Sequence, residues 1–514
     1  MASLSSHNVA RGVVAGVVSA AAGLGVAELV TALLGGSGSP ILSVGNAFVD
    51  ATPRWLKEFA IEAFGQNDKR VLLLGIVATI AVLAAAIGVL AQWRRTPGVA
   101  ASLVVGLVPA VAALTRPDAK LGDALPAAAG ALVASGFLWL LSAPHVQIAA
   151  DGEQPAPSGA QPSRRTFLTL VGVAAAVAVA GVAVGRELAR GRVDVERVRA
   201  ALRLPAPSAS APTLPATVDV PGVAPYITAN DDFYRIDTAL RVPVVDSSSW
   251  RLRIHGMVEN ELTYTFDDLL ALPLVERDVT LTCVSNEVGG ELVGNARWLG
   301  ALIAPILADA GPLTGADQVV SRSVDGMTIG TPLTALTDGR DAMLAVGMNG
   351  DPLPVEHGFP VRMVVPGLYG YVSACKWLQD LEITTFDAYD AYWVERGWVQ
   401  QAPIKISSRI DTPRAGSQVS LPVTVGGVAW AQHTGIDAVE VRVDDGEWQQ
   451  ADLATEGSID SWRLWSWTWS AATPGTHTLS VRAIDRDGTV QPGQPAEPFP
   501  SGATGWHTVS FDVG

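Results

Sequence analysis

Cysteine is almost absent from this chain: Cys283 and Cys375 are the two cysteines among its 514 residues. Two cysteines cannot form a disulfide framework, and their spacing does not fit a zinc motif. Lysine and arginine are in the minority, with 35 of them against 50 aspartates and glutamates, which gives a net charge of -15. This excess of negative charge excludes nucleic acid as an expected partner.

Common nucleotide-binding and hydrolase motifs are missing as well. No GxGxxG follows a strand-like segment, and no GxxxxGK[ST], GxSxG or HExxH occurs, so the sequence does not support nucleotide binding, a hydrolase elbow or a zinc protease. Histidine is scarce, with seven residues, and none lies within the long apolar runs of the chain. A bis-histidine haem inside a membrane is therefore not expected.

The first 190 residues contain several long apolar runs. The mean hydropathy of the whole chain is +0.29. Each run is about as long as a helix that crosses a bilayer core, and Glu28 is the only acidic residue within them. Abundant glycine and alanine suit close helix packing in lipid. We therefore predict an all-α membrane domain over residues 1–190, with the lipid bilayer as partner. Its five runs are Val13–Leu34, Val71–Trp93, Val99–Leu114, Leu125–Leu141 and Phe167–Val184.

The arginine pairs beside these runs predict which way the membrane domain is oriented. Arg94–Arg95 follow the second run and Arg164–Arg165 precede the fifth. If both pairs are cytoplasmic, the N-terminus is inside and the C-terminal half is exported. Arg54, Lys57 and Lys69–Arg70 would then lie outside, which counts against this orientation. We expect a multi-pass protein of the cell membrane whose catalytic and C-terminal parts are extracytoplasmic.

The segment Ser163–Leu168 (SRRTFL) precedes an apolar stretch and is similar to a twin-arginine export signal. An ordinary cytoplasmic arginine pair explains it equally well, so both interpretations stay open. The preceding segment, Asp151–Ser163, is predicted to be a flexible cytoplasmic linker. No cleavage site is obvious, so the fifth helix is expected to remain as an anchor.

Residues 191–217 are predicted to form a linker, because proline, alanine and serine dominate there. From residue 218 to residue 400 strand-like and helix-like segments follow one another in irregular order, which indicates an α+β domain. The expected strands are Trp250–Ile254, Val279–Cys283, Gln318–Ser323 and Val361–Val365, and the expected helices are Phe266–Leu272 and Leu299–Ala310.

Cys283 is the residue around which the functional hypothesis is built. It follows an apolar, β-branched run and precedes a polar, glycine-rich turn, Ser285–Gly290. A thiol at the mouth of a strand is placed to meet a ligand, whereas a structural thiol is more often found within a strand or helix. Taken alone, burial as a small hydrophobic residue is the commoner fate of cysteine.

Four stretches place Cys283 in a larger pattern, and together they resemble the sulfite oxidase family of molybdopterin enzymes. The resemblance covers the chain from about Val218 to Gly514, and its last two stretches are highly specific. The four are Thr228–Arg235 (TANDDFYR), the Cys283 segment with Asn295–Gly300 (NARWLG), Met348–Arg362 (MNGDPLPVEHGFPVR) and Val365–Trp377 (VPGLYGYVSACKW).

This resemblance implies a molybdenum–molybdopterin cofactor and assigns site residues. Cys283 would be the metal ligand and the catalytic residue, which agrees with the preference of such a metal for thiolate. Arg362 offers a fork, and Lys376 a point charge, for the cofactor's phosphate, and His357 could donate to phosphate or pterin. Each of the last three has an ordinary structural explanation when taken singly. The remaining cofactor-binding candidates are Asp231, Tyr234, Arg235, Asp325, Ser373 and Cys375.

Departures from sulfite oxidase bear on the substrate. The family's basic pair after the cysteine loop's asparagine is replaced by Glu287 and Val288, and its active-site tyrosine by Val346, while Arg235 is displaced by one place. A pocket without these arginines should bind the sulfite dianion poorly, because its desolvation is uncompensated. We expect a small neutral substrate such as a sulfoxide, for which the family's periplasmic methionine-sulfoxide reductases are a precedent.

Electrons must pass to a separate carrier, because no haem domain is fused to the chain and no iron–sulfur ligand set is present. An alternative from another class is a membrane-tethered binding protein that retains the fold without redox chemistry. The departures around Cys283 permit this alternative, and the retained His357, Arg362 and Lys376 argue against it.

Residues 401–514 are predicted to form an all-β, immunoglobulin-like domain, because alternating segments are separated by turn signals such as Asp487-Gly488. The resemblance implies a possible homodimer through this domain. Its expected strands include Gln418–Val425, Ala438–Val443 and His477–Ala483. Trp465, Trp467 and Trp469 share one strand face, either as core with one exposed tryptophan or as an interaction surface, and we favour the core.

Overall fold

The structure is a computed structural model that describes residues 6–34, 39–53, 56, 59, 63–64, 68–115, 119–142, 164–192, 195–216, 218–240, 242–470 and 473–514. The chain divides into two compact units, Met1–Asp194 and Val195–Gly514. The expected cytoplasmic linker Asp151–Ser163 lies outside the described residues, as do Arg54 and Lys57.

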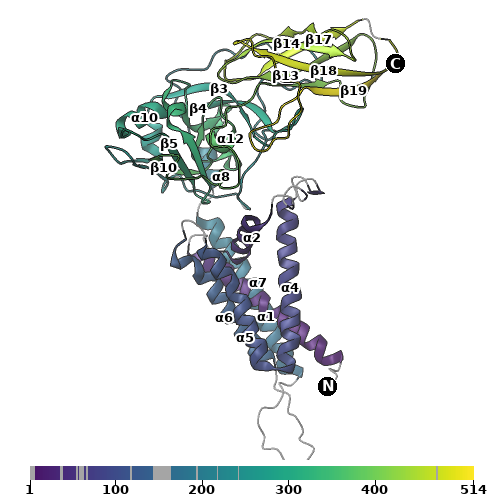
Figure 1. Cartoon of the computed structure of the whole chain (residues 1–514). Helices are drawn as coiled ribbons and strands as arrows, with labels where there is room; N and C mark the ends of the chain where they lie inside the picture. Colours follow the sequence, from purple (N-terminus) through teal and green to yellow (C-terminus); the bar gives the residue numbers. More distant parts are fainter. Residues whose placement is uncertain are drawn as a thin grey trace, which may run out of the picture. The chain divides into compact units, whose positions relative to one another are not determined.

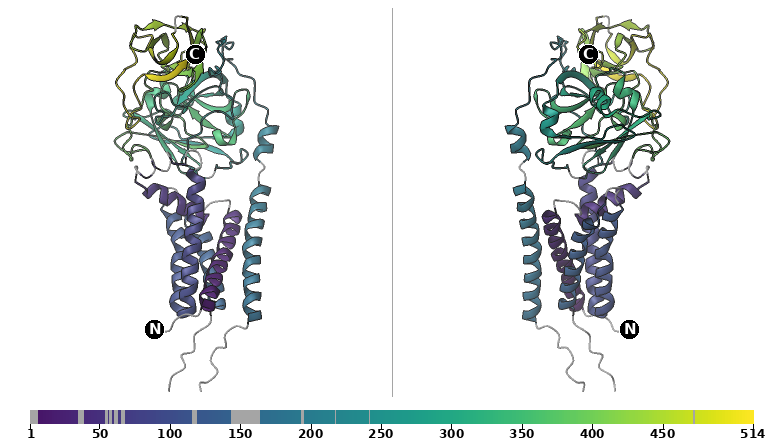
Figure 2. Two further views of the ribbon diagram at one scale, coloured as in Figure 1. Left: turned by 90° about the vertical axis from the view of Figure 1, so that its right-hand side faces the viewer. Right: turned by 90° about the vertical axis from the view of Figure 1, so that its left-hand side faces the viewer.

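The first unit is helical, and its long helices run along a common direction (Figures 1 and 2). Helix α1 contacts α4, α6 and α7, while α5 contacts α4 and α6. The shorter helix α2 was not expected from the sequence. The helices are α1 (Ser6–Leu33), α2 (Pro40–Ala51), α4 (Asp68–Trp93), α5 (Arg95–Leu114), the 3₁₀ turn η2 (Leu121–Ala124), α6 (Leu125–Leu141) and α7 (Arg164–Arg192).

Small residues let the helices of this unit approach closely. A side chain added at Gly16 would meet the Ala84 carbonyl of α4, and one at Gly23 would meet the Gly130 carbonyl of α6. Such contacts are typical of helices that associate in lipid. Among the described residues, five helices are long and apolar enough to span a membrane, and they coincide with the five expected runs. These spans are Asn8–Leu33, Lys69–Trp93, Arg95–Leu114, Leu121–Leu141 and Arg164–Glu187.

One end of this helical unit gathers arginines from several helices. The Arg11 guanidinium lies 4.3 Å from the centre of the Phe167 ring, which joins the beginnings of α1 and α7. Arg95 lies 3.7 Å from the centre of the Trp139 ring, which joins the beginning of α5 to the end of α6. A buried cluster that includes Ala15, Ala91, Leu138 and Phe167 connects the same helix ends.

The second unit begins with a mixed region, residues 251–384, that holds two sheets and short helices (Figure 1). One sheet has the order β2-β1-β10-β5-β6, in which β1 and β10 are parallel; the other has the order β3-β4-β7-β8, with β9 on β7. The expected α+β class is confirmed in this coarse form. The strands are β1 (Arg251–Gly256), β2 (Leu262–Thr265), β3 (Leu274–Thr282), β4 (Val293–Leu302), β5 (Gln318–Ser323), β6 (Thr328–Pro332), β7 (Met343–Met348), β8 (Asp351–Pro352), β9 (Arg362–Val364) and β10 (Leu378–Thr384).

Short helices connect these strands and share one hydrophobic core with them. The helix expected over Leu299–Ala310 is wrong in its first turn, because Leu299–Leu302 belong to strand β4 and the helix α10 begins at Ile303. The helical elements of this unit are α8 (Val195–Ala201), α9 (Phe266–Leu270), α10 (Ile303–Ala310), α11 (Leu333–Thr337), the 3₁₀ turn η3 (Val355–His357) and α12 (Gly370–Ser373).

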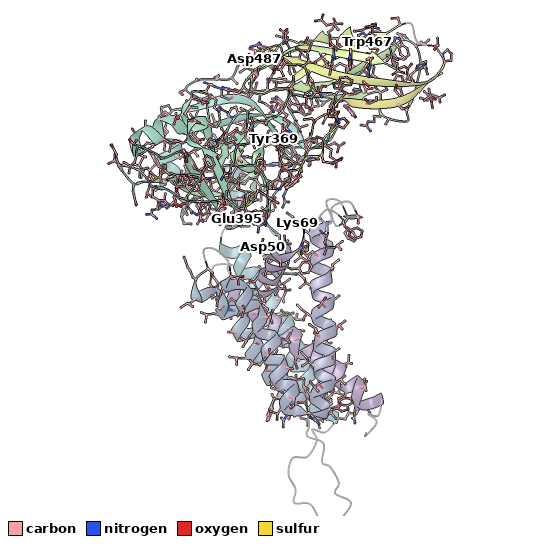
Figure 3. All side chains as sticks on the ribbon, viewed as in Figure 1. Asp50, Lys69, Tyr369, Glu395, Trp467 and Asp487 are labelled. Atoms are coloured by element: carbon pink, nitrogen blue, oxygen red, sulfur yellow. The ribbon has the colours of Figure 1, made fainter. Side chains whose placement is uncertain are left out.

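The all-β region, residues 407–513, consists of two further sheets, and Figure 3 labels Trp467 on it. Trp465 is fully buried, and the half-buried Trp467 and Trp469 pack against the same cluster. The expected core position is confirmed, but none of the three is the exposed tryptophan that was also expected. The sheets have the orders β11-β13-β17-β16 and β12-β19-β18-β14-β15. Their strands are β11 (Ser407–Thr412), β12 (Gln418–Val419), β13 (Val423–Trp430), β14 (Ile436–Val443), β15 (Gln449–Gln450), β16 (Asp452–Leu453), β17 (Arg463–Trp469), β18 (Gly475–Asp485) and β19 (His507–Val513).

The segment after α8 follows the outer edge of β3. The Ser208 N–H donates to the Leu274 carbonyl over 2.7 Å, and the Glu276 N–H donates to the Ala209 carbonyl over 2.8 Å. Part of the expected linker therefore adds main-chain hydrogen bonds to an edge strand.

Candidate active site

A cavity of about 730 Å³, its open mouth included, lies in the mixed region. The lining comes from several residues between 233 and 238, the residue after β3, the region from the end of β5 into β6, and the segment from η3 to the start of β10, which includes β9 and α12. Seven sequence-predicted site residues line it: Tyr234, Cys283, Asp325, His357, Arg362, Cys375 and Lys376.

Cys283 lies where β3 ends and the polar loop begins. Its N–H donates to the Leu292 carbonyl over 2.9 Å, and its carbonyl accepts from the Asn286 N–H over 3.0 Å. Burial raises the pKa of the Cys283 thiol, while hydrogen bonds from Ser285 lower it. The thiol is half-buried and faces the cavity, so it can serve as a ligand donor once it has lost its proton.

Arg362 is a buried cation without an acidic partner among the residues that the structure describes. It is 5% exposed, and its Nε atom has no hydrogen-bond partner in that part of the chain. Its Nη1 donates to the His357 carbonyl over 3.2 Å, and the guanidinium lies 4.8 Å from the centre of the Trp298 ring. Burial lowers the pKa of Arg362 to about 10. A buried guanidinium in this state is placed to receive an anion.

Lys376 is the second cation of the cavity, and it contacts an acid that sequence reasoning missed. Its Nζ donates to Asp237 Oδ2 over 2.9 Å and to the Glu356 carbonyl over 3.2 Å. Burial lowers the pKa of Lys376 to about 8, against the opposing effect of Asp237. Gly358 (φ 115°) separates the two cations: a side chain there would lie 3.0 Å from Arg362 Cβ and 3.2 Å from Lys376 Cα.

His357 is neutral at physiological pH. It is 3% exposed, and burial with the nearby charge of Arg362 lowers its pKa to about 4. Its Nε2 lies 3.0 Å from the Asn230 carbonyl, to which the ring N–H donates. Nδ1 of the neutral ring then carries no proton, so His357, which lines the cavity, has an acceptor there rather than a second donor.

Asp325 and Tyr234 complete the polar part of the lining. Asp325 follows β5 in a turn, where it accepts from the Met327 N–H over 3.3 Å and from Thr238 Oγ1 over 3.4 Å. Tyr234 stacks on Phe233 with ring centres 5.3 Å apart, and burial raises its pKa. Its hydroxyl therefore stays protonated as a potential donor.

Three predicted residues lie outside the lining of the cavity. Asp231 is exposed. Arg235 is also exposed, and its Nε donates to Asp237 Oδ2 over 2.8 Å. Ser373 is fully buried, and its hydroxyl donates to the carbonyls of Leu368 and Tyr369 over 3.0 Å each, as residues near a helix terminus often do.

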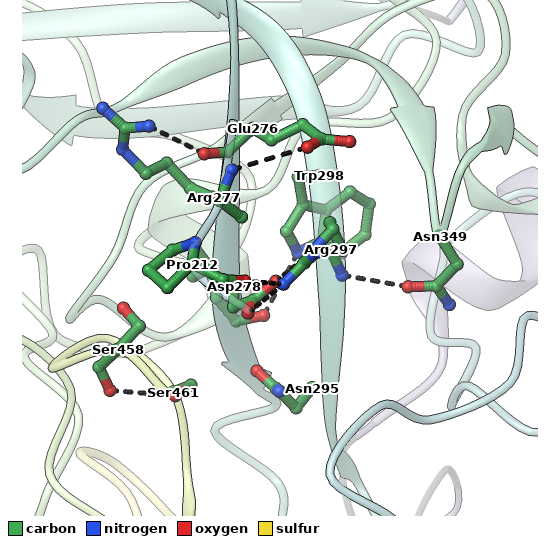
Figure 4. A network of polar contacts seen from close by, with 12 residues as sticks. Pro212, Glu276, Arg277, Asp278, Asn295, Arg297, Trp298, Asn349, Ser458 and Ser461 are labelled. Carbon is green, nitrogen blue, oxygen red and sulfur yellow. Dashed lines mark hydrogen bonds and ion pairs between the residues drawn. The ribbon is translucent and has the colours of Figure 1, made fainter. Parts of the chain in front are cut away.

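A polar network behind the cavity explains other residues of the quoted stretches (Figure 4). Arg297 makes a two-pronged ion pair with buried Asp278, at 2.8 and 2.9 Å. The Arg297 N–H donates to Asn349 Oδ1 over 2.9 Å, and Asn349 Nδ2 donates to the Thr228 carbonyl and to Asn230 Oδ1. These contacts fix the segment that also bonds His357, and they were not foreseen from the sequence.

Comparisons with known proteins agree with this arrangement. Residues 239–393 match the family model described as the oxidoreductase molybdopterin binding domain, and residues 407–481 match that of a bacterial Ig domain. Mitochondrial sulfite oxidase of Homo sapiens is 32% identical over 322 residues, which are 52% of this chain and 57% of that protein. The Mus musculus enzyme is 31% identical, over 56% of this chain and 62% of its own length. The chain therefore spans less than two thirds of these relatives.

Two further similarities concern bacterial proteins. The uncharacterized oxidoreductase YuiH of Bacillus subtilis is 32% identical over 153 residues, which are 30% of this chain and 74% of that protein. The sulfane dehydrogenase SoxCD of Paracoccus pantotrophus, a solved structure, has a TM-score of 0.49 and 23% identity, over 56% of this chain and 82% of the other. The chain belongs to the sulfite oxidase family of molybdopterin oxidoreductases, whose cofactor is molybdenum bound to molybdopterin.

Proposed function

We propose that this protein is a membrane-anchored, extracytoplasmic oxidoreductase that transfers an oxygen atom to or from a small neutral substrate, with a thioether sulfoxide as the favoured class. The observation that carries the proposal is the meeting of Cys283, Arg362 and Lys376 in one cavity. Reduction of a sulfoxide consumes two electrons and two protons and releases a thioether and water.

The cavity fits the cofactor of the family on two counts. Arg362 and Lys376 are the cations among the described lining residues, Gly358 packs against both of them, and Arg362 Nε has no partner in the described chain. A phosphate group would supply the anion that such a buried guanidinium needs. On another part of the lining, Cys283 offers the thiolate that a metal of this kind prefers.

Each residue then has a separate role. When bound, the cofactor supplies reversible two-electron redox chemistry. Cys283 would hold the metal, Arg362 and Lys376 would hold the phosphate, and His357 Nδ1 would be available as an acceptor for the pterin. Asp325 and Tyr234 would contribute further polar groups to the binding of the cofactor. The sequence shows neither a haem nor an iron–sulfur ligand set, so electrons would pass to a separate carrier.

The preference for a neutral substrate rests on the absence of the family's basic pair from the Cys283 loop itself, where Glu287 and Val288 stand instead. Glu287 is exposed and does not line the cavity, so the proposal rests on the lost arginines rather than on repulsion by this carboxylate. Val346 is fully buried within β7 and contributes no hydroxyl. A dianion beside Cys283 would lose its hydration without gaining charge-assisted hydrogen bonds, so its binding would be weak.

Purified full-length protein, made in a host that synthesises the cofactor, gives the decisive test. We expect stoichiometric molybdenum by elemental analysis. We also expect kcat/KM for a thioether sulfoxide to exceed that for sulfite by about a hundredfold, because each missing charge-assisted bond is worth about 1.5–3 kcal/mol. Sulfite turnover as fast as sulfoxide turnover would contradict the substrate class. Molybdenum-free protein would instead favour a membrane-tethered binding protein.

The proposed orientation is supported by the arginine-rich end of the first unit. Arg11, Arg94, Arg95 and Arg164–Arg165 belong to helix ends that meet there. The positive-inside rule places such an end in the cytoplasm. Because α7 begins at this end, the chain that follows α7 would then lie on the opposite side of the membrane.

Cysteine labelling in intact spheroplasts tests this orientation. Leu121→Cys, at an 86% exposed position between α5 and α6, should react with a membrane-impermeant maleimide. Thr96→Cys, exposed at the other end of α5, should react only after permeabilisation. The parental chain measures the background from its own thiols. The reverse labelling pattern would show that the topology is inverted.

A further inference from the structure

The all-β region holds the strand that leads to Cys283. The Thr280 N–H donates to the Asp460 carbonyl over 2.9 Å, and Thr280 Oγ1 accepts from the Trp462 N–H over 2.7 Å. Gln432 Nε2 lies 3.1 Å from the Thr280 carbonyl and 3.3 Å from Thr282 Oγ1. Both main-chain polar groups of Thr280 are therefore bound by a region more than 150 residues further along the chain.

These contacts matter because β3 is an edge strand. In its sheet, β3 pairs with β4 on one side, and Thr280 lies opposite Asn295 in that pairing. The outer edge of β3 has no neighbouring strand in this sheet. An edge strand without cross-links can shift or fray. The all-β region supplies the cross-link at Thr280 and Thr282, three residues and one residue before the thiol.

Gln432 is the side chain that makes this connection. It lies between β13 and β14 and is 5% exposed. Its Nε2 makes both contacts with β3, while its Oε1 has no partner within the described chain. The amide is neutral, so it fixes the strand without changing the charge beside Cys283.

The loop that follows Cys283 is held from the same side. Arg409 Nη1, on β11, donates to the Gly290 carbonyl over 3.0 Å. The His507 ring, on β19, lies against Gly289 so closely that no side chain could replace that glycine's hydrogen. The chain is thus fixed by the all-β region both before and after the thiol.

We propose that Gln432 is a positioning residue that holds β3 in register and thereby fixes the direction in which the Cys283 sulfur points. This inference rests on the proposed role of Cys283 as metal ligand. Groups that orient a ligand contribute to metal affinity and activity although they never touch the metal. Gln432 would do so from a region that contributes no residue to the lining of the cavity.

Gln432→Met is the variant that tests the proposal, because it keeps the side-chain volume and removes the donor. The Thr280 carbonyl then loses a partner, and local opening of the Cys283 segment should become more frequent. In full-length protein made without cofactor, we expect the rate of Cys283 alkylation to rise about tenfold. Cys375 is 1% exposed and is not among the hydrogen-bond partners of Gln432 in the described chain, so it should keep its rate.

Gln491→Met is the matched control. Gln491 is 1% exposed in the same region, and its amide bonds Ser408, Ala483 and Gly505 rather than β3. Its replacement should lower the melting temperature at least as much as Gln432→Met does while leaving Cys283 alkylation unchanged. Equal alkylation rates in the two variants, or no change in either, would overturn the positioning role.

The molybdenum-loaded protein gives a second readout. Gln432→Met should broaden or shift the Mo(V) electron paramagnetic resonance signal, because the thiolate is held less firmly, and Gln491→Met should leave it unchanged. An unchanged signal in Gln432→Met would count against the proposal. The two hypotheses remain separable: wild-type protein without molybdenum would refute the proposed enzyme, whereas the alkylation result depends only on β3 and Gln432.

Discussion

Replacing Cys283 by serine is expected to lower turnover by more than about a hundredfold, since losing even an outer partner of a metal ligand costs about 10–100-fold. A serine hydroxyl has nearly the same size as the thiol but does not ionise near neutral pH, so it cannot replace a thiolate donor. The fold should survive, because the Cys283 thiol is only half-buried. Steady-state turnover and the Mo(V) signal measure the effect.

Cys375→Ser is the control for this prediction. Cys375 lines the same cavity, but it is 1% exposed and burial raises the pKa of its thiol to about 12, so it stays protonated. We expect this variant to keep the wild-type Mo(V) signal. A wild-type signal in Cys283→Ser, or its loss in Cys375→Ser alone, would mean that the metal ligand has been assigned to the wrong cysteine.

Replacing Arg362 by methionine is expected to have opposite effects on the empty and the loaded protein. Without cofactor, the variant removes a buried cation that has no acidic partner in the described chain, which should raise the free energy of unfolding by about 1–4 kcal/mol. With cofactor, it removes a charge-assisted bond to phosphate worth about 1.5–3 kcal/mol. Thermal melting of both forms, together with the rate of cofactor loss at a fixed temperature, measures the two effects.

Arg362→Lys separates charge from shape in the same experiment. Lysine keeps the charge but lacks the planar fork and the stacking of the guanidinium on Trp298. It should lose cofactor at an intermediate rate and gain no stability when empty. If Arg362→Met destabilised the empty protein, the cation would have a structural role and no need of an anion.

The sequence predicted the apolar helices well and the strand boundaries less well. Length and hydropathy alone define a span, so α4 and α6 were located within a few residues. Leu299–Leu302 were misassigned because a continuous apolar run does not distinguish a buried strand from a helix. In the structure these residues pair with β7 inside the sheet, which is a tertiary contact that local pattern cannot show.

In the candidate site as well, the sequence predicted some features and missed those that depend on tertiary contacts. The order of the motifs along the chain correctly predicted that four residues share one site. In the structure, one cavity is lined by Cys283, His357, Arg362 and Lys376. Motif order did not reveal Asp237, because its pairing with Lys376 joins residues 139 positions apart. It also could not show that the Ser373 hydroxyl donates to main-chain carbonyls rather than to a ligand.

The coverage of β3 has a practical consequence for anyone who wishes to produce the catalytic part alone. One stretch of the strand's outer edge is bonded by Ser208 and Ala209, and another by the region that contains Gln432. A fragment limited to residues 239–393 would leave both stretches of the β3 edge exposed to solvent. An exposed strand edge can pair with other chains and cause aggregation. A soluble fragment should therefore begin before Ser208 and continue to Gly514.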